Sequence, residues 1–303
     1  MNLPNSVEII DVCGRDGFQN IKTFIKTEDK VKIIKKIIDS GFKKVEITSF
    51  VNPKRVPQMA DAKEVSKEIL KYAVNKDVKI MALVPNIKGA QIAVESNIRE
   101  ISYVVSVSER HNMENVQSTV EMSMKHFEEI CKEYKGILKV RLDLATSFGC
   151  PFGEKIETKK IISIAQRGLN AGASKIVLAD TVGLGNPIQI GLVLEEVKKH
   201  MDIDDIAMHL HDTRGLALAN TLTALHYGVK EFESATAGLG GCPFAPGASG
   251  NVASEDLENM LTMMGIETNI NLNELNKAIS LIREKVDAPI ISHTAHLYNC
   301  KAI

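Results

Sequence analysis

The sequence predicts a (β/α)8 barrel, an α/β fold, and three observations support this prediction. A short β-branched strand pattern followed by a longer helical pattern occurs eight times in succession. Composition does not shift between the repeats, which argues against two separate domains. No Gly-x-Gly-x-x-Gly follows the first strand, as it would in a doubly wound dinucleotide-binding sheet.

Each strand is expected where β-branched residues are dense, and each helix where apolar residues recur at helical spacing. The expected strands cover residues 7–12, 44–50, 78–84, 100–105, 138–145, 175–180, 206–211 and 230–235. Thr27 is expected to cap the first helix and Gly41 to end it, and Pro187 suits a first helical turn. The helices are expected over residues 28–40, 87–96, 116–134, 158–171, 187–200, 216–227 and 254–263. One more helix is expected to follow a proline-bearing loop after the second strand and to end near residue 72.

The part of the chain after the eighth unit is expected to lie outside the barrel. Residues 271–286 show one more helical pattern, followed by an irregular tail. We therefore expect a catalytic barrel over residues 1–268 and a C-terminal helical extension over residues 269–303, packed on the barrel or on another subunit.

The composition is that of a globular enzyme. Hydrophobic residues make up 44% and charged residues 25%, and the formal net charge is -1, which gives no attraction for nucleic acid or an anionic membrane. No apolar run approaches the ~20 residues needed to cross a bilayer, and the N-terminus lacks a signal pattern. The five cysteines have no Cys-x-x-Cys spacing, so they are expected to be reduced thiols. A cytoplasmic location is the expectation.

A candidate metal site begins at His209 and His211. On a strand these two side chains point to the same face and can reach one ion. Asp16 follows the first strand, which a closed barrel brings near the seventh and eighth, and Asn251 follows the glycine-rich loop. A carboxylate, an amide oxygen and two imidazoles suit Mg2+ or Mn2+ better than a closed zinc site. The alternative is that Asp16 caps a turn and Asn251 caps the following helix.

Arg15, beside Asp16, is a candidate for stabilising a developing oxyanion, because a fixed cation acts most strongly where new charge appears. The alternative is a structural ion pair with Glu46. The loop from Gly238 to Gly250 lacks the Gly-Lys-Ser/Thr ending of a nucleotide-binding loop and is expected to be a lid, with Cys242 placed to carry a proton.

Several runs are similar to those of the 3-hydroxy-3-methylglutaryl-CoA lyase family of metal-dependent barrels. The matching runs are Arg15–Asn20, Ser49–Lys54, Val56–Met59, Asp180–Gly183, His209–Asn220, Ala237–Pro243 and Gly247–Asn251. The resemblance spans nearly the whole chain and implies retro-Claisen cleavage of a 3-hydroxyacyl-CoA.

The resemblance also implies roles for individual residues. The metal ligands would be Asp16, His209, His211 and Asn251, and the catalytic residues would be Arg15 at the enolate, His209 and Cys242 in proton transfer, and Glu46 and Asp180 as supporting acids. The implied partner is an acyl-CoA substrate, and a homo-oligomer, a dimer or a tetramer, is expected.

The chain departs from the family pattern at positions that would line a pocket. Leu142-Asp143 replaces Gly-Tyr, Arg214 replaces Tyr, Arg55 replaces Trp, and Cys13-Gly14 replaces Gly-Pro. We therefore expect that the acyl group can differ from methylglutaryl, with Asp143 and Arg214 as the positions to suspect.

Two other functions remain open. One is a Claisen-type synthase that condenses an acyl-CoA with a 2-oxo acid on the same metal site. Cys242 on its glycine loop, and the absence of a regulatory domain after the barrel, favour the lyase. The other is a catalytically silent barrel, which would have no need of the complete set of candidate residues.

Overall fold

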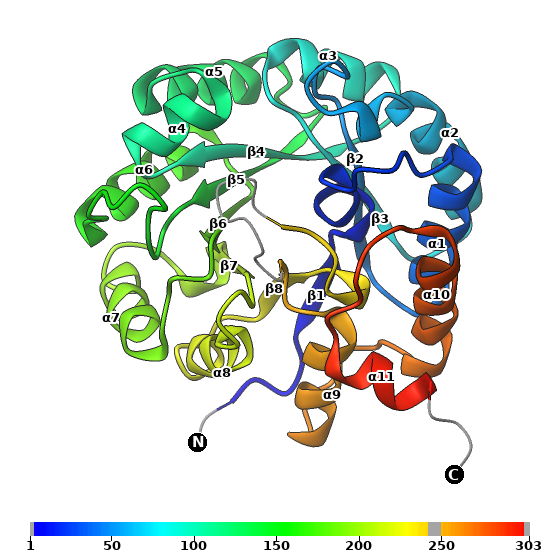
Figure 1. The fold of residues 1–303 in the computed structure, drawn as a ribbon. Helices are drawn as coiled ribbons and strands as arrows, with labels where there is room; N and C mark the ends of the chain where they lie inside the picture. Colours follow the sequence, from blue (N-terminus) through cyan, green and yellow to red (C-terminus); the bar gives the residue numbers. More distant parts are fainter. Residues whose placement is uncertain (1–2, 242–249, 300–303) are drawn as a thin grey trace.

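The computed structural model describes residues 3–241 and 250–299, and within them the strands form a closed barrel (Figure 1). Every strand is parallel to the next along the chain, and β8 pairs with β1 to close the ring. This confirms the predicted (β/α)8 fold. The strands are β1 (Glu8–Asp11), β2 (Lys44–Ser49), β3 (Lys79–Leu83), β4 (Glu100–Ser106), β5 (Lys139–Ala145), β6 (Lys175–Asp180), β7 (Ile206–Leu210) and β8 (Glu231–Ser234).

Helices surround the barrel and bury apolar faces against it. They are α1 (Thr27–Asp39), α2 (Ala62–Ala73), α3 (Ile87–Glu95), α4 (Glu109–Val116), α5 (Val120–Glu133), α6 (Thr158–Ala171), α7 (Pro187–Val197), α8 (Ala217–His226), α9 (Ser254–Met263), α10 (Leu272–Lys285) and α11 (His293–Asn299). Short turns occur at η1 (Cys13–Gly17), η2 (Pro57–Met59), η3 (Ile203–Asp205) and η4 (Thr236–Gly238).

Four local predictions were wrong. The helix expected over residues 116–134 is α5, which begins at Val120 with Thr119 as its cap, and the unpredicted helix α4 precedes it and ends where Gln117 is left-handed. Thr27 is the first residue of α1 and not its cap, and its Oγ1 donates to Asp61 Oδ2 at 2.8 Å. The loop expected around Arg15 begins with the π-helical turn η1. The irregular tail contains α11, whose first backbone N–H groups donate to the Asp256 carboxylate at 2.8 Å.

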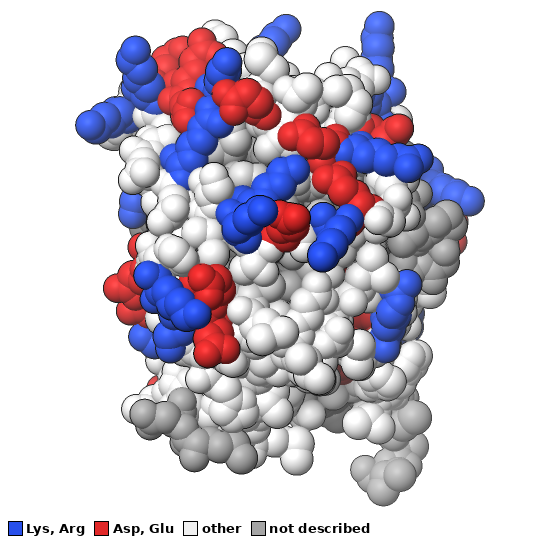
Figure 2. Space-filling view, turned by 90° about the vertical axis from the view of Figure 1, so that its left-hand side faces the viewer, with Lys and Arg blue, Asp and Glu red and all other residues white. Residues whose placement is uncertain are grey.

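The C-terminal segment lies against the outside of the barrel. Helix α10 packs on α1, and α11 contacts α9 (Figure 1). The domain boundary at residue 268 remains a prediction. None of the helices described is long and apolar enough to span a bilayer. On the face seen in Figure 2, basic and acidic side chains lie next to one another, in keeping with the small net charge.

The barrel interior contains charged side chains as well as apolar ones. Strand β5 alternates: Leu142 lies against α6, where a Cβ added to Gly168 would be 2.4 Å from its Cδ2. The neighbouring Arg141 points inward and is completely buried. Its guanidinium pairs with Glu231 and with Glu233 at 2.8 Å, both on β8 across the ring. The interior therefore carries an ion-pair network below the site.

One carboxylate joins the first and last strands. Asp11, at the end of β1, accepts hydrogen bonds from Cys13 N at 2.9 Å, from Thr236 Oγ1 at 2.6 Å and from Ser254 Oγ at 2.8 Å. These donors lie in η1, in the turn after β8, and at the start of α9. The chain segments that carry residues 16 and 251 are thus held to a common anchor.

Replacing Glu255 with Gln is expected to make the protein more stable relative to wild type as pH rises. Glu255 is buried and holds the base of the glycine-rich loop by accepting from Ala237 N at 3.0 Å. Burial raises its pKa from 4.5 to about 7, so its contribution to stability is full below pH 4.5 and is lost as pH rises through 7. The neutral amide removes that loss.

Urea unfolding at pH 4.5 and pH 8 measures this effect. The free energy of unfolding of Glu255→Gln, relative to wild type, should rise between these values by ~3 kcal/mol. Parallel pH profiles for the two proteins would contradict the assignment.

Candidate metal centre and active site

A cavity of about 530 Å3 opens at the carboxyl ends of the strands, where the sequence predicted the chemistry. Polar groups from η1, β5, β7 and β8 line its floor, and apolar side chains from β2, β3 and β4 and the segments after them form a wall. The floor includes Arg15, Asp16, Asp143, His209, His211 and Glu233, and the wall includes Val51, Val56, Leu83, Val84 and Val104.

The turn η1 places Arg15 and Asp16 at the floor of the cavity. The N–H groups of residues 15, 16 and 17 all point to Val12 O, at 3.1, 2.8 and 3.2 Å. A Cβ at Gly14 would lie 2.9 Å from Ile47 Cα, so only glycine lets the turn pack this closely on β2. The tight turn therefore depends on Gly14, one of the residues that departs from the family pattern.

Three of the four predicted metal ligands come together in one cluster. Ligand atoms of Asp16, His209 and His211 lie within 4.8 Å of one another. His211 Nε2 is 3.1 Å from His209 Nε2 and 3.8 Å from Asp16 Oδ2. All three side chains are buried, with 4–8% exposure. A carboxylate oxygen from the start of the chain and two imidazole nitrogens from its last third thus face one point.

The protonation states of this cluster suit a cation. Burial, and then the charge of His209, lower the pKa of His211 to about 3, so its imidazole is neutral and keeps a lone pair. Burial alone would raise the pKa of Asp16, but Arg15 and the two histidines lower it overall. Asp16 is therefore a carboxylate, the form that binds metals.

Asn251, the fourth predicted ligand, lies beside the cluster. It forms an isolated antiparallel bridge with His211, and its Nδ2 donates to Asp16 Oδ2 at 2.7 Å and to Leu239 O at 3.0 Å. Its Oδ1 is buried and has no hydrogen-bond partner in the described part of the chain. An unpaired amide oxygen, on a side chain whose nitrogen contacts Asp16, is the type of ligand that a hard cation prefers.

Gly240 allows the loop to pass close to these ligands. Its φ is +118°, and a Cβ there would lie 2.3 Å from Asn251 Nδ2 and 3.2 Å from Asp16 Oδ2. Any other side chain would displace one of the two. The first part of the predicted lid thus contacts two of the candidate metal ligands, whereas Cys242 lies outside the described residues.

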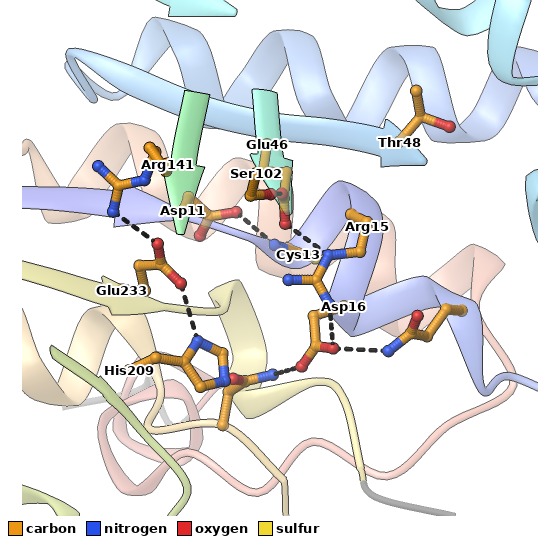
Figure 3. Close-up of polar contacts among 12 residues, drawn as sticks. Asp11, Cys13, Arg15, Asp16, Glu46, Thr48, Ser102, Arg141, His209 and Glu233 are labelled. Carbon is orange, nitrogen blue, oxygen red and sulfur yellow. Dashed lines mark hydrogen bonds and ion pairs between the residues drawn. The ribbon is translucent and has the colours of Figure 1, made fainter. Parts of the chain in front are cut away.

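Glu233 orients His209, and the sequence analysis did not single it out. Its Oε2 lies 3.0 Å from His209 Nδ1, while Oε1 accepts from Arg141 (Figure 3). Burial opposes protonation of His209, but the Glu233 contact and charge raise its pKa overall. A carboxylate on Nδ1 is the usual second contact of a histidine that ligates a metal through Nε2. Nε2 of His209 is thus left facing the candidate metal cluster. In the sequence, the pattern that could have marked Glu233 as a functional residue is its alternation with Glu231, which puts both acids on one face of β8.

Arg15 is held between two carboxylates. Its Nε donates to Glu46 Oε2 and its Nη1 to Asp16 Oδ1, both at 2.5 Å, while Ser102 Oγ donates to Glu46 (Figure 3). The ion pair with Glu46, which the sequence analysis weighed as an alternative, is therefore present. It does not exclude a catalytic role, because the guanidinium still lines the cavity. Glu46 contacts Arg15 from below and is not among the described lining residues.

Two further predicted positions, Asp180 and Arg214, are not among the described residues that line the cavity. Asp180 accepts from the N–H groups of Leu184 at 2.9 Å and Gly185 at 3.0 Å and so shapes the loop between β6 and α7. Burial raises its pKa to about 6. Arg214 donates to the backbone carbonyls of Val182 and Gly183, at 3.1 and 2.9 Å. Of the two positions suspected for substrate choice, only Asp143 is found among the described lining residues.

Comparison with known proteins agrees with this geometry. The HMGL-like family model matches residues 6–282. The chain is 40% identical to the hydroxymethylglutaryl-CoA lyase YngG of Bacillus subtilis (strain 168), over 98% of this chain and 99% of that protein.

Solved structures show the same similarity. A crystal structure of a Bacillus subtilis HMG-CoA lyase superposes with a TM-score of 0.95 at 39% identity, covering 99% of this chain and 100% of that one. An HMG-CoA lyase from Acinetobacter baumannii, in complex with coenzyme A and 3-methylmalate, has a TM-score of 0.93 at 36% identity, covering 99% and 97%. The chain therefore belongs to the HMGL-like family.

Proposed function

We propose that this protein is a divalent-metal-dependent carbon-carbon lyase. It cleaves 3-hydroxy-3-methylglutaryl-CoA, or a closely related 3-hydroxyacyl-CoA, to acetyl-CoA and acetoacetate by a retro-Claisen reaction. The observation that carries the proposal is the convergence of Asp16, His209 and His211 beside Arg15 in one cavity. Near full-length similarity to named HMG-CoA lyases supports the substrate class.

Asp16, His209, His211 and Asn251 are proposed to hold the ion, which is Mg2+ or Mn2+ given two oxygen and two nitrogen donors. When bound, the ion supplies Lewis-acid polarisation of the substrate's tertiary hydroxyl. The unpaired Asn251 Oδ1 and the lone pair of neutral His211 support this ligand set.

Breaking the bond between C2 and C3 requires loss of the hydroxyl proton and a place for negative charge on the thioester oxygen. We propose that Arg15 stabilises this negative charge. Its guanidinium is kept cationic by the carboxylates of Glu46 and Asp16, and Glu46 in turn accepts a hydrogen bond from Ser102. A preorganised cation in a buried cavity stabilises an enolate more strongly than water does.

Proton transfer is assigned to His209, whose basicity is raised by Glu233 at Nδ1. Glu233 occupies Nδ1 of His209, so Nε2 is the nitrogen that would hold the ion or accept a proton. Glu46 and Asp180 are proposed as positioning residues. Cys242 is proposed to return a proton to the enolate when the lid closes.

The acyl group is proposed to be presented as a coenzyme A thioester. The Acinetobacter baumannii relative was solved with coenzyme A, which supports this choice. A cytoplasmic location, a dimeric or tetrameric assembly and the absence of a nucleic-acid partner remain predictions from the sequence.

The test is an assay of the purified full-length protein with 3-hydroxy-3-methylglutaryl-CoA after dialysis against a chelator. We expect acetyl-CoA and acetoacetate only when Mg2+ or Mn2+ is restored. Metal-dependent condensation of acetyl-CoA with a 2-oxo acid, without cleavage, would instead establish the synthase. Cleavage unaffected by chelation would overturn the metal assignment.

A further inference from the structure

Asp143 is a buried acid in the cavity that no step of the proposed reaction uses. It lies on β5, which is opposite β1 in the ring (Figure 1). Asp143 and Ala145, two residues apart on this strand, both line the cavity. Only 6% of Asp143 is exposed. Its Oδ1 is buried and has no hydrogen-bond partner among residues 3–241 and 250–299.

The cations near Asp143 are already paired with other carboxylates. Arg141 binds Glu231 and Glu233, and Arg15 binds Glu46 and Asp16. Each of these four carboxylates thus has a cationic partner, whereas no ion pair is found for Asp143 in the described part of the chain. Burial, followed by the charge of Glu233, raises the pKa of Asp143 well above its ordinary value. A protonated carboxyl group has an O–H to donate.

Asp143 and the candidate metal ligands line the same cavity from different sides of the ring. The candidate metal ligands and Arg15 come from η1, β7 and the loop after β8, on one side of the ring. Asp143 lies on β5, where the apolar Val104 of β4 is its register partner. A branched 3-hydroxyacyl chain whose hydroxyl is held at the metal end therefore has its remaining branch near Asp143.

We propose that Asp143 determines which acyl chain is accepted, by donating a hydrogen bond to a carboxylate at the end of the acyl chain remote from the thioester. This inference rests on the function proposed above and adds the residue that reads the acyl chain. A hydrogen bond from a carboxylic acid to a carboxylate is short and strong. A hydrocarbon branch would bury Asp143 with its polar atoms unpaired, so the site discriminates against it.

The experiment measures binding of two thioesters that lack the 3-hydroxyl and cannot be cleaved. 3-Methylglutaryl-CoA carries the carboxylate, and 3,5-dimethylhexanoyl-CoA carries an isopropyl group of similar shape in its place. Dissociation constants are measured by calorimetry on the full-length, Mn2+-loaded protein. Wild type should bind the acid about 10- to 100-fold more tightly than the hydrocarbon analogue.

Two variants of nearly equal size form the matched pair. Asp143→Asn keeps an N–H donor and should keep the preference within about threefold, whereas Asp143→Leu should lose about 10-fold or more in affinity for the acid alone. Mn2+ affinity and the thermal midpoint report whether each variant is folded, and Asp143→Ala replaces the Leu variant if that one is not. The proposal is overturned if the variant without a donor keeps the preference, or if its affinities for both thioesters fall equally.

Because neither thioester can react, this result is independent of turnover. Selective binding that depends on residue 143, in a protein that does not cleave 3-hydroxy-3-methylglutaryl-CoA, would reject the lyase and keep the recognition role. Cleavage together with equal binding of both thioesters would reject only the recognition role.

Discussion

Replacing Arg15 with Gln is expected to lower kcat for thioester cleavage by about 1,000-fold, the upper range for loss of one oxyanion-stabilising group. The glutamine keeps a hydrogen-bond donor but removes the cation that lines the cavity beside Asp16. Asp16 keeps its Asn251 and Gln19 contacts, at 2.7 and 2.6 Å, so Mn2+ affinity should change little. Steady-state kinetics and Mn2+ titration by electron paramagnetic resonance measure the two effects.

Arg15→Lys is the matched control for charge. Lysine keeps the cation but cannot bridge Glu46 and Asp16 as the guanidinium fork does, so its kcat should lie between wild type and Arg15→Gln. Unchanged turnover in Arg15→Gln would exclude the enolate role. A parallel loss of Mn2+ affinity would instead make Arg15 a support for Asp16.

Replacing His211 with Ala is expected to abolish turnover by removing the metal. His211 has no charge to contribute because its pKa is about 3, and its Nε2 faces His209 and Asp16 inside the cluster. Ligation is therefore its main task in the proposed site. Mn2+ affinity should fall by about 100-fold or more, and kcat by about 1,000-fold at metal concentrations that saturate wild type.

His226→Ala is the control for this change. His226 is exposed on α8 and contacts only the carbonyl of Leu222 among the interactions described, at 2.9 Å. It should leave Mn2+ affinity and turnover as in wild type. If added Mn2+ fully restores the His211 variant, the residue tunes affinity only, and if Mn2+ affinity is unchanged the ligand set is wrong.

The eightfold repeat was sufficient to predict the barrel, because each β-branched run must pair with the next to bury both faces. It also placed Asp16, His209 and His211 together, since strand ends meet at one edge. Glu233 and Arg141 escaped notice because a charged residue alternating along a strand usually marks a solvated face. Here the two acids of β8 face the centre of a closed ring, where both pair with Arg141 of β5.

Helix α4 was missed for a different reason. Its residues are mostly polar and its buried positions are His111 and Asn112, so no apolar spacing marks it; it depends on the Ser108 cap at its start and on the left-handed Gln117 at its end. Asp143 was suspected from its departure from the family pattern. Its unpaired oxygen follows from which neighbouring cations are already occupied, and that depends on side-chain packing.

The hydrogen bonds by which Asp11 joins η1 to the segment after β8 have a consequence for how the protein matures. The ion's prospective ligands are separated by 235 positions, so a growing polypeptide has no complete coordination sphere until nearly all of it has left the ribosome. Binding of the metal is then coupled to pairing of the last strand with the first. The free energy of metal binding therefore stabilises the protein against global unfolding rather than against local fraying. Loss of the Asp11 hydrogen bonds is therefore expected to weaken metal binding and the packing of the segment after β8 together.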